Sequence, residues 1–309
     1  MLKGKDLLSI HDLSRDEVEE IIDCAAKLKV MQKSGVEHKL LSGKTLGMIF
    51  EKSSTRTRVS FEVGIFQLGG TGLFLSSKDL QLGRGEPIKD TARVLARYLD
   101  GIMIRTFKQS EVEELAKYAD IPVINGLTDL LHPCQVLTDL LTIREHKGKN
   151  FRALKMAYVG DGNNMTNSYL YGAAKVGMTL TVATPADYKP NQKVYETALA
   201  DAEETGAKLS WTENPIEAVR DADIIATDTW ASMGQEAEHD ALKKIFAPYQ
   251  VNKQLLSHAS KNVIVLHCLP AYRGEEITDD VLEDNAHVIF DEAENRLHTQ
   301  KAIMALTMG

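Results

Sequence analysis

Hydroxyl and guanidinium groups gather in the stretch Ser53-Ser54-Thr55-Arg56-Thr57-Arg58. The apolar run 46–50 before it predicts a buried strand, and the apolar residues after it recur at helical spacing up to Gly69-Gly70. Free backbone N–H groups and the positive end of a helix dipole are expected where a strand turns into a helix. Together these groups predict an oxyanion site, with phosphate as the expected ligand. A capped helix with two solvated arginines is the alternative interpretation.

Two more cationic or titratable side chains are expected at the same edge. Arg105 follows the apolar run 102–104, which predicts a strand. His132 precedes Pro133, and proline suits the first turn of the helix that the apolar residues after it predict. A single histidine is often structural, so His132 alone would not define a site.

Polar residues also end two predicted strands in the second half of the chain. Asp228 follows the run 224–227, and the segment His267-Cys268-Leu269-Pro270 follows the run 263–266. A carboxylate at a strand end is suited to hold an ammonium group, although a capping aspartate would look the same. Amides at Asn163-Asn164 follow a third strand.

Strands that alternate with helices along the whole chain predict an α/β protein with parallel sheets covered by helices. Ligands of such sheets bind outside the carboxyl ends of the strands. A polar stretch at 148–150 is the candidate boundary between two units of ordinary domain size. The last strand is predicted at 288–290, with a final helix after it.

The turn Gly160-Asp161-Gly162-Asn163-Asn164-Met165 superficially looks like a dinucleotide-binding fingerprint. Met165 stands where the third glycine would be, and the strand that ends at 183–185 carries no acidic residue for a ribose. Nicotinamide binding is therefore not expected.

The bulk composition excludes several classes of protein. The net charge of −8 over 309 residues argues against a general nucleic-acid binder, and no apolar run approaches the length of a membrane span. The N-terminus lacks the apolar core of a signal peptide. Cys24, Cys134 and Cys268 have no zinc-ligand spacing, which favours a reduced, cytoplasmic setting.

At this point the motifs resemble those of the aspartate/ornithine carbamoyltransferase family. They are Ser54-Thr55-Arg56-Thr57-Arg58, His132-Pro133-Cys134-Gln135, Asp228 with Ser232-Met233-Gly234, and His267-Cys268-Leu269-Pro270, in the family's order. The first two are shared by carbamoyltransferases in general. The last two are similar to those of the ornithine-specific members rather than the aspartate-specific ones.

The resemblance implies two similar domains with the active site in the cleft between them. Residues 1–147, with a C-terminal helix at about 293–309, would bind carbamoyl phosphate, and residues 148–292 would bind ornithine. Family members are trimers or multiples of trimers, and Gln81 would reach into a neighbouring subunit's site. No metal or other cofactor, nucleic acid or membrane is implied.

The resemblance also implies the site residues. For carbamoyl phosphate they are Ser54, Thr55, Arg56, Thr57, Gln81, Arg105, His132, Pro133, Cys134, Gln135, Cys268, Leu269 and Arg296. For ornithine they are Asn164, Asp228, Ser232 and Met233. Arg105, Thr57 and His132 would donate to the carbonyl oxygen, Gln135 would hold the carbamoyl nitrogen, and Cys268 would lie beside the attacking amine.

The implied reaction transfers a carbamoyl group to the side-chain amine of ornithine, giving citrulline and phosphate, within arginine biosynthesis. Arg105, His132, Asp228 and Cys268 are the expected catalytic residues. Aspartate or putrescine as the acceptor remains open. So do a nucleotide-binding oxidoreductase, an anion-binding module without turnover, and a cysteine hydrolase that uses Cys268.

Overall fold

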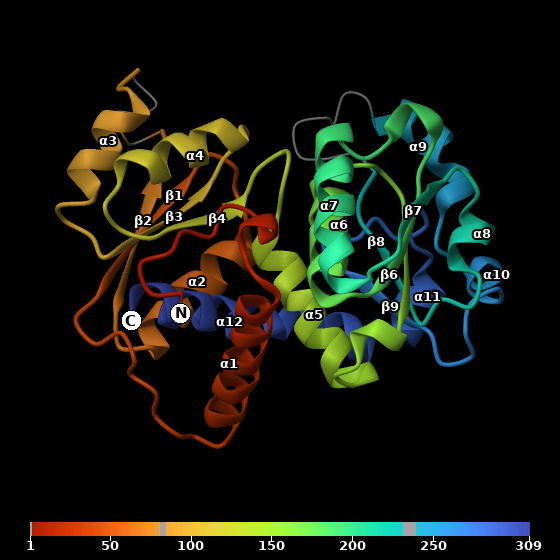
Figure 1. Ribbon diagram of the computed structural model, residues 1–309, viewed down its shortest axis with the longest axis horizontal. Coiled ribbons are helices and arrows are strands. Elements are labelled where there is room, and N and C mark those ends of the chain that lie inside the picture. The colour runs from red at the N-terminus through yellow and green to blue at the C-terminus, as the bar shows by residue number, and fades with distance from the viewer. Residues whose placement is uncertain (1, 79, 81–84, 231–238) are drawn as a thin grey trace. The chain divides into compact units, whose positions relative to one another are not determined.

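The computed structural model describes residues 2–78, 80, 85–230 and 239–309. Two compact units make up the chain, and Figure 1 shows the elements of each. The first unit combines Met1–Leu141 with Glu294–Gly309, and the second is Thr142–Ala293. Three residues expected at the site, Gln81, Ser232 and Met233, lie outside the described residues.

The first unit is built on a four-stranded parallel sheet in the order β2-β1-β3-β4. Its strands are β1 (Thr45–Phe50), β2 (Thr71–Ser76), β3 (Gly101–Arg105) and β4 (Val123–Leu127). Its helices are η1 (Ile10–Asp12), α1 (Arg15–Lys33), α2 (Thr55–Gln67), α3 (Ile88–Leu95), α4 (Gln109–Tyr118), most of α5 (Pro133–Lys147) and the end of α12 (Ala286–Met308).

The second unit is built on a five-stranded parallel sheet in the order β7-β6-β5-β8-β9. Its strands are β5 (Lys155–Val159), β6 (Thr179–Ala183), β7 (Leu209–Thr212), β8 (Ile224–Thr227) and β9 (Ile264–His267). Its helical elements are η3 (Phe151–Ala153), α6 (Asn164–Val176), η4 (Ala186–Tyr188), α7 (Gln192–Thr205), α8 (Pro215–Val219), α9 (His239–Phe246), η6 (Ala247–Tyr249), α10 (Lys253–Leu256) and α11 (Asp279–Asp284).

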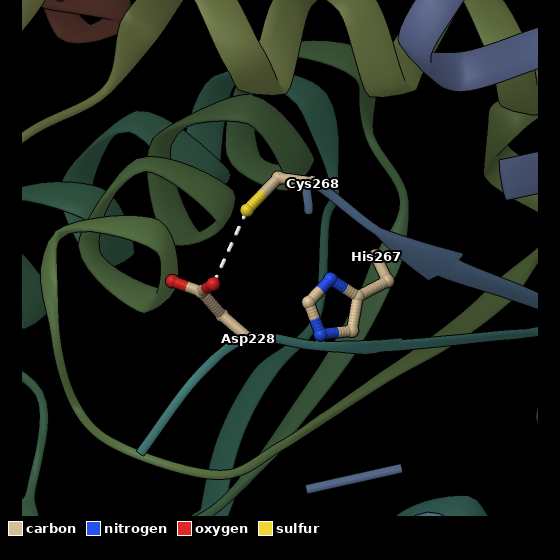
Figure 2. A group of neighbouring side chains, drawn as sticks. All are labelled: Asp228, His267 and Cys268. Atoms are coloured by element: carbon tan, nitrogen blue, oxygen red, sulfur yellow. Dashed lines mark hydrogen bonds between the residues drawn. The ribbon is translucent and has the colours of Figure 1, made fainter. Parts of the chain in front are cut away.

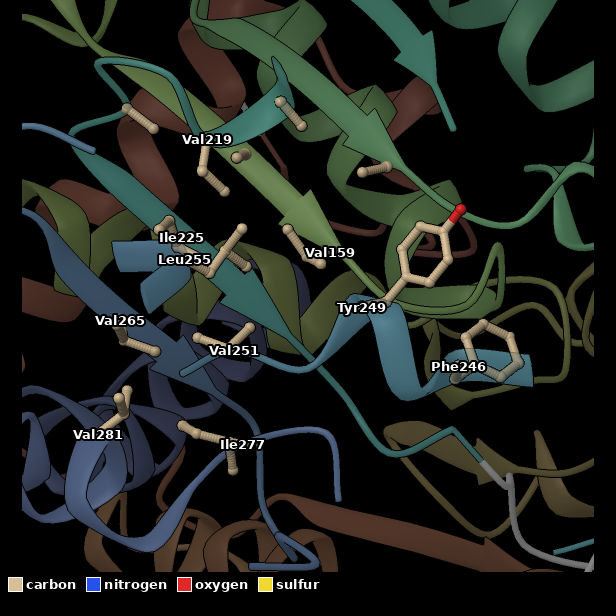
Figure 3. Packing of buried hydrophobic residues seen from close by; sticks show 14 of the residues in the cluster. Val159, Val219, Ile225, Phe246, Tyr249, Val251, Leu255, Val265, Ile277 and Val281 are labelled. Atoms are coloured by element: carbon tan, nitrogen blue, oxygen red, sulfur yellow. The ribbon is translucent and has the colours of Figure 1, made fainter. Parts of the chain in front are cut away.

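The predicted α/β class, with one parallel sheet and covering helices in each unit, is confirmed. Apolar side chains from strands and helices fill the interior of each unit. Figure 3 shows this packing in the second unit, where Val159 of β5, Ile225 of β8 and Val265 of β9 are fully buried together with Phe246 of α9. In the first unit Ile49, Ile102 and Val123 of neighbouring strands form the corresponding core.

The strand predicted at 288–290 is wrong. These residues belong to α12, which already begins at Ala286. A three-residue apolar run cannot distinguish a strand from one face of a helix. In the helix, Val288 and Ile289 are buried whereas Phe290 is 56% exposed, because successive helical residues point in different directions.

Within the described residues, no helix is both long and apolar enough to cross a membrane.

Candidate functional site

The start of α2 carries the hydroxyl groups of the first unit's polar cluster. Ser54 is the N-cap of this helix, and its Oγ accepts from the backbone N–H of Thr57 at 3.2 Å. The helix begins at Thr55, shortly after β1 ends at Phe50, so its N-terminus follows the carboxyl end of this strand. An N-terminus of this kind favours an anion.

Thr57 is fully buried and its hydroxyl oxygen accepts two hydrogen bonds. The Ser54 hydroxyl donates to Thr57 Oγ1 at 3.1 Å, and Nη2 of Arg296 donates to the same atom at 3.0 Å. A hydroxyl oxygen has two lone pairs, and both are used in this way. The Thr57 hydrogen is therefore directed toward a further acceptor, which suits a ligand oxygen.

Arg296 joins this cluster from the far end of the sequence. It lies on α12 and is 4% exposed. Its Nη1 donates to Gln135 Oε1 on α5 at 2.6 Å, and Gln135 Nε2 donates to Asp139 Oδ1 at 2.8 Å. The connected side chains thus come from α2, α5 and α12.

His132 and Arg105 are both buried, and the charges of Arg105 and Arg296 act on the His132 imidazole. Burial, with the positive charges of Arg296 and Arg105, holds the pKa of His132 well below its ordinary value of 6.5. The imidazole is therefore neutral near pH 7. A neutral imidazole can donate one hydrogen bond to a developing oxyanion without carrying a charge itself.

The neighbouring expected residues differ in exposure. Thr55 is exposed and Arg56 half-buried on the first turn of α2. Pro133 is the first residue of α5. The thiol of Cys134 donates to the carbonyl of Asn125 at 3.4 Å, and burial raises the pKa of Cys134 to about 12. This thiol is therefore not a nucleophile.

Asp228 is the centre of the second unit's polar cluster, at the end of β8. Its Oδ1 accepts from Cys268 Sγ at 3.2 Å, as Figure 2 shows, and its Oδ2 accepts from Asn163 Nδ2 at 3.2 Å. Asn163 is also the N-cap of α6, where Oδ1 accepts from two backbone N–H groups. Asn164, one of the residues expected to bind ornithine, is the next residue and is half-buried.

Two residues of this cluster were not identified from the sequence. Burial, and then the charge of Asp228, raises the pKa of Asp161 from 3.8 to about 7. The same two causes raise the pKa of the buried Tyr158 phenol well above 10. The acidic turn residue after β5 was visible in the sequence, but its closeness to Asp228 depends on the pairing of β5 with β8.

The turn after β9 is held by a buried histidine. His267 Nδ1 accepts from the backbone N–H of Leu269 at 2.9 Å, so the ring proton lies on Nε2 and is donated to Glu276 Oε1 at 3.0 Å. Leu269 has a φ of +56°, an unfavourable angle for a side chain of its size. The histidine therefore stabilises the unusual backbone that carries Cys268.

Asp228, His267 and Cys268 are the group within the described residues that could hold a metal ion, since their ligand atoms lie within 4.8 Å of one another. Both His267 nitrogens already make hydrogen bonds. A metal would have to displace one of these, so the arrangement favours an organic ligand at Asp228.

The glycine turn after β5 has a structural explanation. A Cβ on Gly162 would lie 2.4 Å from the backbone of Tyr188 and Lys189, and its N–H donates to Tyr188 O at 3.0 Å. Gly162 therefore permits close packing of this turn against the backbone of Tyr188 and Lys189.

Two family models match the chain. The one described as "Aspartate/ornithine carbamoyltransferase, carbamoyl-P binding domain" matches residues 5–145, and "Aspartate/ornithine carbamoyltransferase, Asp/Orn binding domain" matches residues 152–307. The chain therefore belongs to the aspartate/ornithine carbamoyltransferase family, as the motifs predicted.

Its relatives include two proteins named ornithine carbamoyltransferase. That of Carboxydothermus hydrogenoformans is 60% identical over 307 residues, covering 99% of this chain and 98% of the relative. That of Thermococcus kodakarensis is 56% identical over 308 residues, covering 100% and 98%. The solved ornithine carbamoyltransferase of Pyrococcus furiosus superimposes with a TM-score of 0.96 at 53% identity, covering 100% of this chain and 98% of that one.

Proposed function

We propose that this protein transfers the carbamoyl group of carbamoyl phosphate to the side-chain amine of L-ornithine, forming L-citrulline and phosphate. The observation that carries the proposal is the buried network of Arg296, Gln135 and Thr57 at the start of α2. It combines a cation, an amide and a hydroxyl donor beside a helix N-terminus. These are the groups that a phosphorylated carbamate needs.

The phosphate is held by Ser54, Thr55, Arg56 and Thr57, with Arg105, and the single hydroxyl hydrogen of Thr57 is directed to the carbonyl oxygen. The carbonyl oxygen becomes more negative as the amine attacks. Arg105, Thr57 and neutral His132 donate to it at that stage, and one such donor is worth about 3–4 kcal/mol at a transition state. Gln135 accepts from the carbamoyl nitrogen. Further contacts to carbamoyl phosphate come from Gln81, Pro133, Cys134, Cys268, Leu269 and Arg296.

Ornithine is held by the acidic cluster of the second unit. Asp228 accepts from the α-ammonium group, and Asn164 donates to the α-carboxylate, with Ser232 and Met233 proposed as further ornithine-binding residues. The side-chain amine must be neutral to attack, and nearby arginine charges favour loss of its proton. Cys268, oriented by Asp228, lies beside that amine.

The test is a citrulline assay with a panel of acceptors. We expect carbamoyl phosphate to yield phosphate and citrulline in equal amounts with ornithine, and little product with aspartate or putrescine. Product with aspartate alone would assign the chain to the aspartate branch of the family. Phosphate binding without turnover on any amine would reduce it to an anion-binding module.

We also propose the bounds of the two domains, the cellular compartment of the protein and its metabolic role. Residues 1–147, with the helix at about 293–309, form the carbamoyl-phosphate-binding domain, and residues 148–292 form the ornithine-binding domain. The three free cysteines support a reduced, cytoplasmic setting. The Pyrococcus furiosus relative is named "Ornithine carbamoyltransferase, anabolic", which supports a role in arginine biosynthesis.

We also propose a homotrimer or a multiple of trimers. The edge strand β2 exposes Leu73 and Phe74, and the adjacent α2 exposes Val59 and Phe66, the last at 76%. An exposed apolar edge strand favours association with another chain. Phe66→Glu should lower the sedimentation coefficient toward that of a monomer, whereas Val30→Glu, at an exposed position of α1, should not. A wild-type monomer at micromolar concentration would contradict the proposal.

A further inference from the structure

The amide of Gln135 is held from both ends by groups of opposite character. Arg296 Nη1 donates to its oxygen at 2.6 Å, and its nitrogen donates to Asp139 Oδ1 at 2.8 Å. All three side chains are at least 96% buried, since their exposed fractions are 1%, 4% and 0%. These contacts lie in a water-poor interior, where charge-assisted hydrogen bonds are strong.

This arrangement permits one orientation of the amide. If the Gln135 amide were flipped, its NH₂ group would face the Arg296 guanidinium, which has donors only. Its oxygen would then face the Asp139 carboxylate, which when ionised has acceptors only. Arg296 and Asp139 therefore fix together which end of Gln135 is the acceptor, and Asp139 does so from the nitrogen end.

Sequence spacing explains the contact. Gln135 and Asp139 are four residues apart on α5, so their side chains lie on the same face of the helix, one turn apart. Asp139 is a fully buried carboxylate in the run Val136 to Leu141, which is apolar apart from Thr138 and Asp139 itself. Burying a carboxylate is costly, which favours a functional rather than a space-filling role.

We infer that Asp139 is a positioning residue that orients the Gln135 amide and thereby sets selectivity for the carbamoyl nitrogen over a methyl group. The inference rests on the proposed role of Gln135, whose oxygen accepts from the NH₂ group of carbamoyl phosphate. Acetyl phosphate has the same phosphate and carbonyl groups but carries CH₃ in place of NH₂. An oriented Gln135 oxygen can accept a hydrogen bond from carbamoyl phosphate, whereas the methyl group of acetyl phosphate has no hydrogen bond to donate.

The experiment compares dissociation constants for carbamoyl phosphate, acetyl phosphate and inorganic phosphate in the full-length protein. Asp139→Ala should weaken carbamoyl phosphate binding about tenfold, as expected for one lost charge-assisted contact. Acetyl phosphate and inorganic phosphate should change by less than about twofold. Asp139→Asn keeps an acceptor oxygen for Gln135 Nε2 and should recover most of the selectivity. If Asp139→Ala does not fold, Asp139→Ser, which is too short to reach Nε2, replaces it with the same expectation.

Gln135→Leu separates the two hypotheses. Lost selectivity in both Gln135→Leu and Asp139→Ala supports the inference. Lost selectivity in Gln135→Leu alone overturns the role of Asp139 while leaving the proposed function intact. Unchanged selectivity in Gln135→Leu overturns the role of Gln135 itself. Equal weakening of all three ligands in Asp139→Ala, or no rescue by Asp139→Asn, would indicate a merely structural residue.

Discussion

The two units place polar side chains at the same topological position but give them opposite charge. In the first unit, β1 leads into α2, and the cluster contains Arg105 and Arg296. In the second, β5 leads into α6, and the cluster contains Asp161 and Asp228. Each helix begins with a polar N-cap that hydrogen-bonds into its own cluster. The parallel sheet supplies the position, and the charged residues determine the ligand.

The electrostatic consequences are also opposite. Positive charge and burial keep His132 neutral in the first cluster. Negative charge and burial keep Asp161 protonated up to about pH 7 in the second. In the proposed function the cationic cluster binds the phosphate and the acidic cluster binds the ammonium group of the amino acid, which matches each ligand with the opposite charge.

The largest expected effect is in the cationic cluster. Arg296→Met removes a buried cation that donates to Gln135 and Thr57, and should lower kcat/KM for carbamoyl phosphate about 10³-fold. Steady-state kinetics measure this. KM for ornithine at saturating carbamoyl phosphate should change less than about threefold. Arg15→Met, at an exposed position of α1, is the control and should behave like the wild type. An equal loss of kcat/KM for carbamoyl phosphate and for ornithine would show that Arg296 is not specific to carbamoyl phosphate.

The next effect is in the acidic cluster. Asp228→Asn removes the charged acceptor for an α-ammonium group, and should lower kcat/KM for ornithine about 10²-fold. 5-Aminopentanoate has the reacting amine but no α-ammonium group, so its kcat/KM should change little. Asp284→Asn, at an exposed carboxylate, is the control. A loss that is equal for both acceptors would show that Asp228 does not recognise the α-ammonium group.

A smaller effect is expected for Cys268→Ser. The serine hydroxyl can also donate to Asp228, as the thiol does at 3.2 Å. We therefore expect kcat about tenfold lower, with KM for carbamoyl phosphate unchanged. Complete loss of turnover, together with trapping of a thioester in the wild type, would favour the alternative of a cysteine hydrolase.

Much of this comparison could be predicted from the sequence, because local signals define it. The hydroxyl and arginine run before a helical pattern predicted the start of α2, and apolar runs predicted the strand that ends at Arg105 and the strand that Asp228 follows. The resemblance supplied Arg296, which no local pattern connects to Thr57, 239 residues away.

The rest could not be predicted because it depends on tertiary contacts. The raised pKa of Asp161 requires burial and the nearby charge of Asp228. Asp139 looked like an ordinary helical aspartate, although a charged residue one turn after Gln135 in an apolar run was a usable signal. The mistaken strand at 288–290 shows the converse, since a short apolar run carries too little periodicity.

The smallest expected effect is a change of ligand affinity with pH. It tests the acidic cluster separately from the cationic cluster. Norvaline carries the α-ammonium and α-carboxylate groups of ornithine but no side-chain amine, so it binds without reacting in the presence of carbamoyl phosphate. The α-ammonium group of norvaline should bind more tightly when Asp161 is ionised. With a pKa of about 7 for Asp161, the dissociation constant of norvaline should rise up to about tenfold from pH 8 to pH 6. His132 does not titrate in this range.

The free energy of unfolding of the ligand-free protein should fall as pH rises, whereas the affinity for norvaline should increase. The pKa of Asp161 is about 7 in the folded protein and is taken as its ordinary value of 3.8 in the unfolded chain. Between these two pH values the folded protein therefore holds a proton that the unfolded chain releases. This contribution to the free energy of unfolding is fully present below pH 3.8 and is lost as pH rises through 7. Asp161→Asn should flatten both the norvaline titration and this part of the stability profile, measured by urea unfolding between pH 5 and 8. A variant that flattened stability but left the norvaline titration unchanged would show that Asp161 is buried beside Asp228 without facing the ligand.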